Sequence, residues 1–186
     1  MNPSSPIPPG PSRVAGSPHD ADVEGTPSVH PEVTRTEMAQ IVLPSFANAR
    51  GTAFGGQIAA WSDVCAAISA QRYARSAVVT ASMDELHFLR PIRAGMIVVL
   101  KAQVNAAWRS SMEVGVRVEA EEPTTGHREH CCSAYLTFVS LDEAGRPRLV
   151  PELDTGGDPV LERRNREAGA RREARLRMRE LRRAAL

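Results

Sequence analysis

The sequence has little of several features that mark particular classes of protein. Its 186 residues include three cysteines, Cys65, Cys131 and Cys132. An odd number, with two of them adjacent, does not predict a disulfide framework, and no spacing matches a zinc site. No apolar run approaches the roughly 18 to 20 residues that cross a membrane, and the start, MNPSSPIPPGPSRV, lacks the basic and apolar regions of a secretory signal. We therefore expect reduced thiols, a cytoplasmic location, no metal site and no membrane partner.

Aromatic residues make up only 4% of the chain, and Lys101 is its single lysine, whereas arginine is concentrated near the C-terminus. Residues 160–186 contain ten arginines and four glutamates, although the formal net charge of the whole chain is only +1. Such a local excess can indicate binding to nucleic acid or another anionic surface. Because no aromatic residues lie among the arginines to stack on bases, we do not expect nucleic acid as the partner. The alternatives are a solvated helix held by Glu–Arg pairs, or disorder.

The composition divides the chain into three parts. Residues 1–33 are rich in Pro, Ser, Gly and Asp and show no hydrophobic period, which predicts a disordered tail. Residues 34–152 carry the periodic apolar segments of a folded domain, and the length is consistent with one domain plus tails. Residues 153–186 form the Arg-rich tail, and its proline-free stretch from Leu161 suits a helix.

The middle part predicts one long helix followed by long strands. Residues 51–74 are mostly small, apolar and helix-forming. In MEVGVRVEAE, apolar and charged residues alternate with the period of two that is typical of a half-buried strand. The segments TEMAQIVLP, AVVTASMDELHFL, MIVVLKAQVNA and HCCSAYLTFVSL are further strands. Short connections favour antiparallel pairing, and the sheet must wrap the single helix to bury it. The predicted fold is α+β.

The predicted helix begins at two adjacent glycines and has one carboxylate, Asp63, in its middle. Gly55 and Gly56 can bring backbone N–H groups close to a ligand at a helix N-terminus, where the helix dipole adds partial positive charge. Asp63 lies seven residues after Gly56, about two turns later on the same face. A catalytic carboxylate fits this placement. The alternative is an aspartate that satisfies a buried donor, with glycines that merely permit a tight turn.

These residues also carry a family resemblance. LPSFANARGTAFGGQIAAWSDVCAAISA resembles the P-x-x-x-N-x-x-G-x-x-F/H-G-G-x-x-x-x-x-x-D segment of hot-dog-fold acyl-CoA thioesterases, in the branch of the YciA-type and brain acyl-CoA hydrolase enzymes. VVTASMDELHFLRPIRAGMIV, WRSSMEVGVRVEAE and AYLTFVSLDEAGRPR resemble later segments of the family, in the same order, so the likeness covers roughly residues 36–152. It implies a hot-dog fold, in which a five-stranded antiparallel sheet surrounds one helix. It also implies dimers or trimers of dimers with active sites between subunits.

The resemblance implies roles for individual residues. Asp63 would be the general base, or a nucleophile that forms an anhydride. Asn48 would help to hold the water or the substrate carbonyl, facing Asp63 of the partner subunit. The Gly56 amide would stabilise the oxyanion, with Gly55 beside it. Thr52 and Phe54 would contact substrate, and Phe54 stands where other members have His.

A second set of residues is expected at the coenzyme A moiety. Arg109 can pair with a phosphate, and serines with their amides can hydrogen-bond it. The resemblance places the loop WRSS, Trp108 to Ser111, at coenzyme A. The candidates there are Arg109, Ser110 and Ser111, and Arg90 and Arg93 are weaker candidates. An ordinary hairpin with an exposed arginine is the alternative. His87 and Cys65 are expected to be structural.

The predicted function is hydrolysis of acyl-CoA to free acid and coenzyme A, with no cofactor beyond the coenzyme A of the substrate. The first alternative is a hot-dog protein that binds acyl-CoA without turnover, as a regulator; pure binding would need neither Asn48 nor Asp63. A hot-dog dehydratase is the second alternative. That class uses an Asp–His pair, and no histidine lies in the predicted helix or the loop before it.

Overall fold

The structure is a computed structural model that describes residues 27–184. Its elements are β1 (Ser28–Val29), η1 (Pro31–Thr34), β2 (Thr36–Ile41), η2 (Pro44–Phe46), α1 (Gly55–Ala74), β3 (Ala77–Phe88), β4 (Ile97–Ala107), β5 (Ser111–Glu121), β6 (Arg128–Leu141), β7 (Glu152–Leu153) and α2 (Pro159–Ala184). Most of the stretch predicted to be disordered, residues 1–33, lies outside the described residues. Its last residues, in contrast, form β1, which pairs in parallel with β7, and most of η1. Within residues 27–184, no helix is long and apolar enough to span a membrane.

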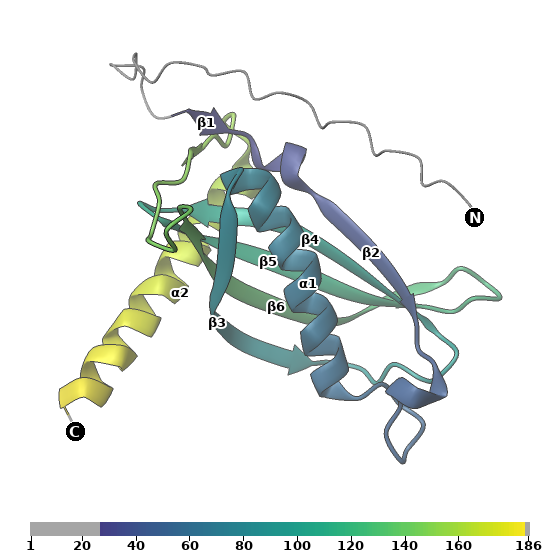
Figure 1. The fold of residues 1–186 in the computed structure, drawn as a ribbon. Coiled ribbons are helices and arrows are strands. Elements are labelled where there is room, and N and C mark those ends of the chain that lie inside the picture. Colours follow the sequence, from purple (N-terminus) through teal and green to yellow (C-terminus); the bar gives the residue numbers. More distant parts are fainter. Residues whose placement is uncertain (1–26, 185–186) are drawn as a thin grey trace, which may run out of the picture.

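Five strands form one antiparallel sheet in the order β2-β4-β5-β6-β3, and this sheet curls around α1 (Figure 1). β2 and β3 are therefore its two edges. The predicted hot-dog fold is confirmed, with one long helix wrapped by a five-stranded sheet. The short hairpin connections explain the antiparallel pairing of β4 with β5 and of β5 with β6, because parallel neighbours would need long crossovers.

The alternation along the strands decides which face of the sheet meets the helix. In β5, Met112, Val114, Val116 and Val118 are buried in the same apolar core as Ile58, Trp61, Ala66, Ala70 and Tyr73 of α1. Ala66 and Ala70 are small, so the sheet can approach the helix closely beside them. Each large apolar side chain that leaves water contributes roughly 1.5–3 kcal/mol. The residues that alternate with them in β5 point to the outer face and include Glu113, Arg117 and Glu119.

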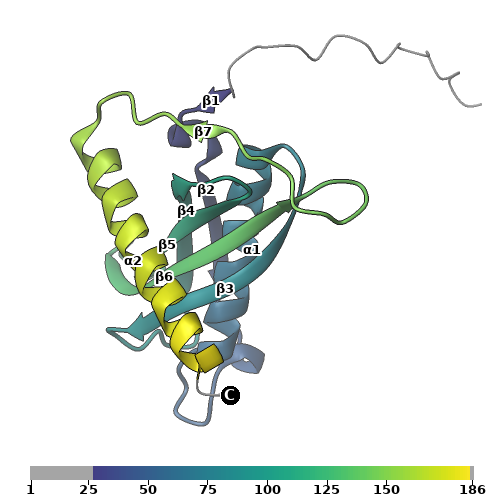
Figure 2. The ribbon, with the colours of Figure 1, turned by 90° about the vertical axis from the view of Figure 1, so that its left-hand side faces the viewer.

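The C-terminal helix α2 lies across this outer face, from β4 to β3 (Figure 2). Arg164 donates to Gln103 on β4 at 2.6 Å, and Arg171 donates to Glu113 on β5 at 2.6 Å and 3.1 Å. Farther along, Arg175 donates to Asp84 on β3 at 2.5 Å. Leu161 and Ala168 are the buried residues of the helix. Arginine contacts, more than apolar ones, hold α2 on the sheet.

Candidate active site

Asp63 lies in the middle of α1, partly buried, and faces the edge strand β3. The hydroxyl of Thr80 donates a hydrogen bond to Asp63 Oδ1 at 2.7 Å. Among the described residues, Oδ2 has no hydrogen-bond donor and the carboxylate has no cationic partner. The donor is an exposed threonine, so Asp63 does not serve a donor deep in the core. One oxygen is held in place and the other is free to accept a proton.

Thr80 is a candidate site residue that the sequence analysis missed. It comes directly before a β-bulge, where the pairing of β3 with β6 shifts between Thr80 and Ser82. A bulge of this kind turns a side chain away from its regular direction. The only sequence signal is a hydroxyl residue in the apolar run AVVTAS, and periodicity does not show which helix residue that hydroxyl meets.

The start of α1 offers two free amides. Phe54, the N-cap residue, makes no side-chain capping hydrogen bond. Among the described residues, the N–H groups of Gly55 and Gly56 have no acceptor. Such uncapped amides at a helix N-terminus favour an anion or a polarised oxygen.

Aromatic rings lie close to both glycines, so a side chain at either position would crowd a ring. A Cβ at Gly55 would lie 3.2 Å from the Phe88 ring, and a Cβ at Gly56 would lie 2.6 Å from the Phe54 ring. Next to them, a cavity of about 290 Å³ is lined by Thr52, Gly55, Phe88 and Arg90, among others. The structure thus brings three predicted site residues, Thr52, Gly55 and Arg90, to one cavity.

Asn48 is held within its own loop. Its Nδ2 donates to Thr52 Oγ1 at 2.9 Å, and its Oδ1 accepts from the Arg50 amide at 2.9 Å. These contacts fix the amide side chain on an exposed loop. Within one chain, the described residues show no contact between Asn48 and Asp63.

The loop of Trp108 to Ser111 is the hairpin between β4 and β5. The Trp108 amide donates to the Ser111 carbonyl at 2.8 Å, which closes the turn. Ser110 is partly buried and Arg109 is exposed. Ser111 pairs with Val139, which pairs with Val79, the residue before Thr80. The hairpin therefore lies across β6 from Thr80.

The remaining candidates differ in their surroundings. Arg90 pairs with Glu129 at 3.2 Å, so a carboxylate already offsets part of its charge. Arg93 forms a backbone bridge to Thr52. Cys65 packs in the core, where burial raises the pKa of its thiol to about 11, so the predicted structural role is confirmed for this residue. No group of three His, Cys, Asp or Glu that could hold a metal ion occurs in the described part of the chain.

Comparison with known proteins gives consistent results. The family model described as the thioesterase superfamily matches residues 50–127. The uncharacterized acyl-CoA thioester hydrolase YkhA of Bacillus subtilis is 41% identical over 137 residues, which cover 68% of this chain and 80% of that protein. Acyl-coenzyme A thioesterase 11 of mouse is also 41% identical, over 158 residues and 84% of this chain. The chain spans only about a quarter of the mouse protein, 26%.

A solved structure matches over nearly its whole length. The acyl-CoA hydrolase of Staphylococcus aureus, determined in complex with butyryl coenzyme A, coenzyme A and coenzyme A disulfide, superposes with a TM-score of 0.79 at 34% identity. The match covers 86% of this chain and 96% of the Staphylococcus aureus chain.

Proposed function

The chain belongs to the thioesterase superfamily, and we propose that it hydrolyses acyl-CoA to a free carboxylic acid and coenzyme A. The observation that carries this proposal is the environment of Asp63. Its carboxylate is partly buried on α1, has one oxygen fixed by Thr80, and has the other oxygen free. That arrangement suits a general base better than a structural ion pair.

In the proposed reaction, Asp63 takes a proton from a water molecule whose oxygen attacks the thioester carbonyl carbon. The Gly56 amide, with Gly55 beside it, donates to the oxyanion that forms. When the tetrahedral intermediate collapses, the C–S bond breaks and the proton passes from Asp63 to the coenzyme A thiolate. Direct attack by Asp63 with formation of an anhydride is the alternative; a single turnover in oxygen-18 water would label the Asp63 carboxylate only on that route.

The Staphylococcus aureus enzyme supports this choice of residues. Structures of it exist with alanine in place of an asparagine, an aspartate and a threonine, at positions 15 and 17 residues apart. Asn48, Asp63 and Thr80 have the same order and the same spacing. Agreement in three residue types and in both intervals is not expected by chance. We therefore assign Thr80 to the site with Asn48 and Asp63.

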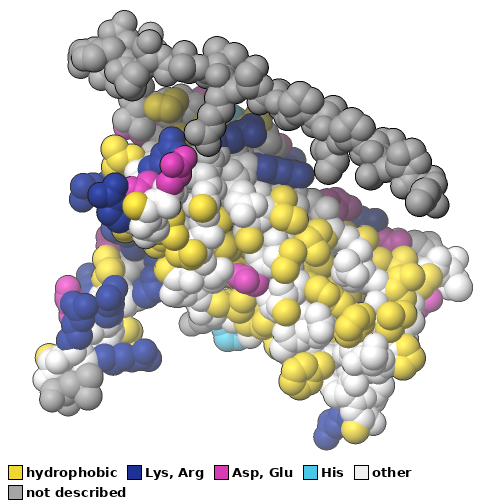
Figure 3. Space-filling view, in the orientation of Figure 1, with side chains coloured by type: hydrophobic (Ala, Val, Ile, Leu, Met, Phe, Trp, Pro, Cys, Tyr) yellow, Lys and Arg dark blue, Asp and Glu magenta, His cyan; other side chains and the backbone are white. Residues whose placement is uncertain are grey.

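The arrangement also supports a site shared between two copies of the chain. Asn48 does not meet Asp63 in one chain, and β3, beside Asp63, is an edge of the sheet. Large apolar side chains are exposed around it, among them Phe54 (61%), Val79 (47%) and Phe88 (49%). Figure 3 shows many apolar and few charged side chains on this face. We assign it to a homodimer interface that brings Asn48 of one subunit to Asp63 of the other. A hexameric acyl-CoA thioesterase, 38% identical over 82% of this chain, is consistent with self-association.

The experiment that tests the function is thiol release from a panel of acyl-CoA substrates, with wild type compared to Asp63→Asn. Asparagine is nearly isosteric and can still accept from Thr80, so the fold should be kept. We expect turnover to fall on the order of 10²-fold or more, as for loss of a general base. Equal activity of the two proteins would contradict the role of Asp63. Binding of acyl-CoA without thiol release by wild type would favour the regulator alternative.

A further inference from the structure

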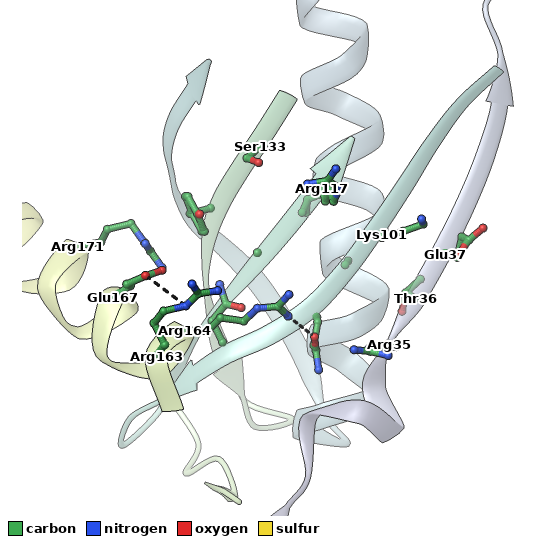
Figure 4. A pocket seen from close by; sticks show the side chains of 16 residues that line it. Arg35, Thr36, Glu37, Lys101, Arg117, Ser133, Arg163, Arg164, Glu167 and Arg171 are labelled. Atoms are coloured by element: carbon green, nitrogen blue, oxygen red, sulfur yellow. Dashed lines mark hydrogen bonds and ion pairs between the residues drawn. The ribbon is translucent and has the colours of Figure 1, made fainter. Parts of the chain in front are cut away.

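A second cavity lies on the outer face of the sheet, away from α1 and Asp63. It has a volume of about 640 Å³ and is bounded by β4, β5, β6, the start of β2 and the first half of α2 (Figure 4). We call it the outer cavity. Its size is within the range of about 300–1,000 Å³ that is usual for small-molecule sites. The proposed thioesterase reaction makes no use of it.

The lining of the outer cavity is dominated by cations from separate elements. Two acidic side chains, Glu37 and Glu167, line it as well. Figure 4 shows the arginines of α2 facing Arg35, just before β2, and Arg117 of β5 across the space. The six lining cations are Arg35, Lys101, Arg117, Arg163, Arg164 and Arg171.

Some of these cations have a carboxylate partner of their own. Arg171 pairs with the buried Glu113 at 2.6 Å, and Arg35 pairs with Glu32 at 2.7 Å. Arg163 lies 3.8 Å from Glu167. Three cations therefore have a carboxylate each.

The charges of Lys101 and Arg117 are only half offset. Both donate to the same carboxylate, that of Glu119, at 2.7 Å and 2.6 Å. Burial alone would raise the pKa of Glu119, but the hydrogen bonds from Arg117 and Lys101 hold it below its ordinary value. Glu119 is thus ionised near neutral pH, and the three side chains together carry one positive charge.

Arg164 supplies a second excess charge. It is partly buried, and its guanidinium donates to the neutral amide oxygen of Gln103 at 2.6 Å. No carboxylate pairs with Arg164 among the described residues. Of the two carboxylates that line the cavity, Glu167 lies beside Arg163. The other, Glu37, is exposed and lies 3.9 Å from Arg128. A partly buried cation without a counter-charge is costly, and a bound anion would relieve that cost.

The lining also narrows the class of anion. Arg171 lies over the Tyr135 ring at 3.7 Å and so occupies one of the two faces on which a nucleobase could stack. Guanidinium groups match the oxygens of phosphate in geometry and charge. We propose that the outer cavity binds a small anion with several phosphate charges, of the oligophosphate class. Such an anion would join Arg163 and Arg164 of α2 to Lys101 and Arg117 of the sheet.

Calorimetric titration of the full-length chain with inorganic triphosphate, at fixed ionic strength, tests this site. We expect saturable binding that weakens as salt rises and a rise in melting temperature with triphosphate concentration. Arg164→Gln should weaken binding about tenfold or more, as for loss of a charged hydrogen-bonding group. Arg166→Gln is the matched control, because Arg166 is exposed on the same helix, pairs with Glu162 at 3.9 Å, and changes the net charge equally.

Three outcomes would overturn the proposal. The first is the absence of saturable binding by the folded wild type. The second is equal weakening by Arg164→Gln and Arg166→Gln, which would indicate general attraction to a basic helix. The third is competition between triphosphate and coenzyme A, which would assign the outer cavity to the substrate site. If Arg164→Gln fails to fold, Lys101→Gln takes its place with the same expectations.

Discussion

At the scale of single residues, the proposed chemistry depends on how Asp63 is oriented. Its one hydrogen bond among the described residues comes from Thr80. A carboxylate on a helix can rotate about its side-chain bonds, and a fixed oxygen limits that freedom. We therefore propose that Thr80 acts through Asp63 as a positioning residue, with no need to touch the substrate.

Replacing Thr80 tests this role. Thr80→Val keeps the shape but removes the hydroxyl donor, and we expect kcat to fall roughly 10- to 100-fold, the usual worth of a hydrogen bond to a charged group. Thr80→Ser keeps the donor and should restore most of the activity. A steady-state assay with one acyl-CoA measures both variants. If Thr80→Val matches wild type, or if Thr80→Ser is as damaged as Thr80→Val, the hydrogen bond has no catalytic value.

The candidate residues differ in how far the sequence could predict them. Gly55, Gly56 and Asp63 lie in one short segment, and helix geometry alone places Gly56 and Asp63 on the same face. Thr80 belongs to another element, and its contact with Asp63 depends on a strand register that is shifted by a bulge. Local patterns do not encode such a register, so this contact required the three-dimensional structure.

At the scale of elements, the hairpin between β4 and β5 can be tested separately from the site at Asp63. Arg109 is exposed at its turn, and its side chain has no ion-pair partner among the described residues, so its charge is available to a phosphate. Arg109→Ala should raise KM for acyl-CoA far more than for a short thioester without the nucleotide, because only acyl-CoA has the phosphates. Kinetics on both substrates measure the difference. Equal losses on the two substrates would remove this hairpin from the coenzyme A site.

α2 is the element that the sequence described least well. The tail has little apolar face, so hydrophobic periodicity gave no reason to expect that it packs on the sheet. In the structure, arginines of α2 make the contacts with the sheet that apolar side chains would otherwise make. Glu113 is fully buried beneath Arg171. The inner face of the sheet, in contrast, was predictable because its strands alternate with a period of two.

The buried pair of Glu113 and Arg171 leads to a prediction about stability. Arg171→Ala leaves the carboxylate with Asn105 as its remaining hydrogen-bond donor, at 3.1 Å. Loss of one partner of a buried pair costs about 3–5 kcal/mol, so we expect a clear drop in the urea midpoint. The double variant Glu113→Gln with Arg171→Ala should recover part of that loss. Arg166→Ala, on the exposed side of α2, is the control, and equal stability of the two single variants would contradict the docking role.

At the scale of the whole molecule, the single chain leaves the proposed site incomplete. The amides at the start of α1, the carboxylate of Asp63 and the loop of Asn48 belong to one chain, but that loop is bonded to itself. Among the described residues, the edge strand β3 has a neighbouring strand on one side only, and apolar side chains are exposed along it beside Asp63. Edges of this kind are templates for pairing with another chain. A two-fold axis beside β3 would bury that edge and create two equivalent sites.

Mixing two inactive variants tests the shared site directly. Asn48→Ala subunits and Asp63→Asn subunits are combined under conditions that allow exchange. In a mixed dimer, the Asn48→Ala subunit still supplies Asp63 and the other subunit still supplies Asn48. One of the two sites then combines wild-type residues, while the other carries both substitutions. With random pairing about half of the dimers are mixed, so activity should return to about a quarter of wild type, by the symmetry of a two-fold interface.

If Asn48 and Asp63 worked within one subunit, every site would carry one substitution and mixing would rescue nothing. A flat activity after exchange has been verified by native mass spectrometry would therefore disprove the shared site and leave each chain with a site of its own.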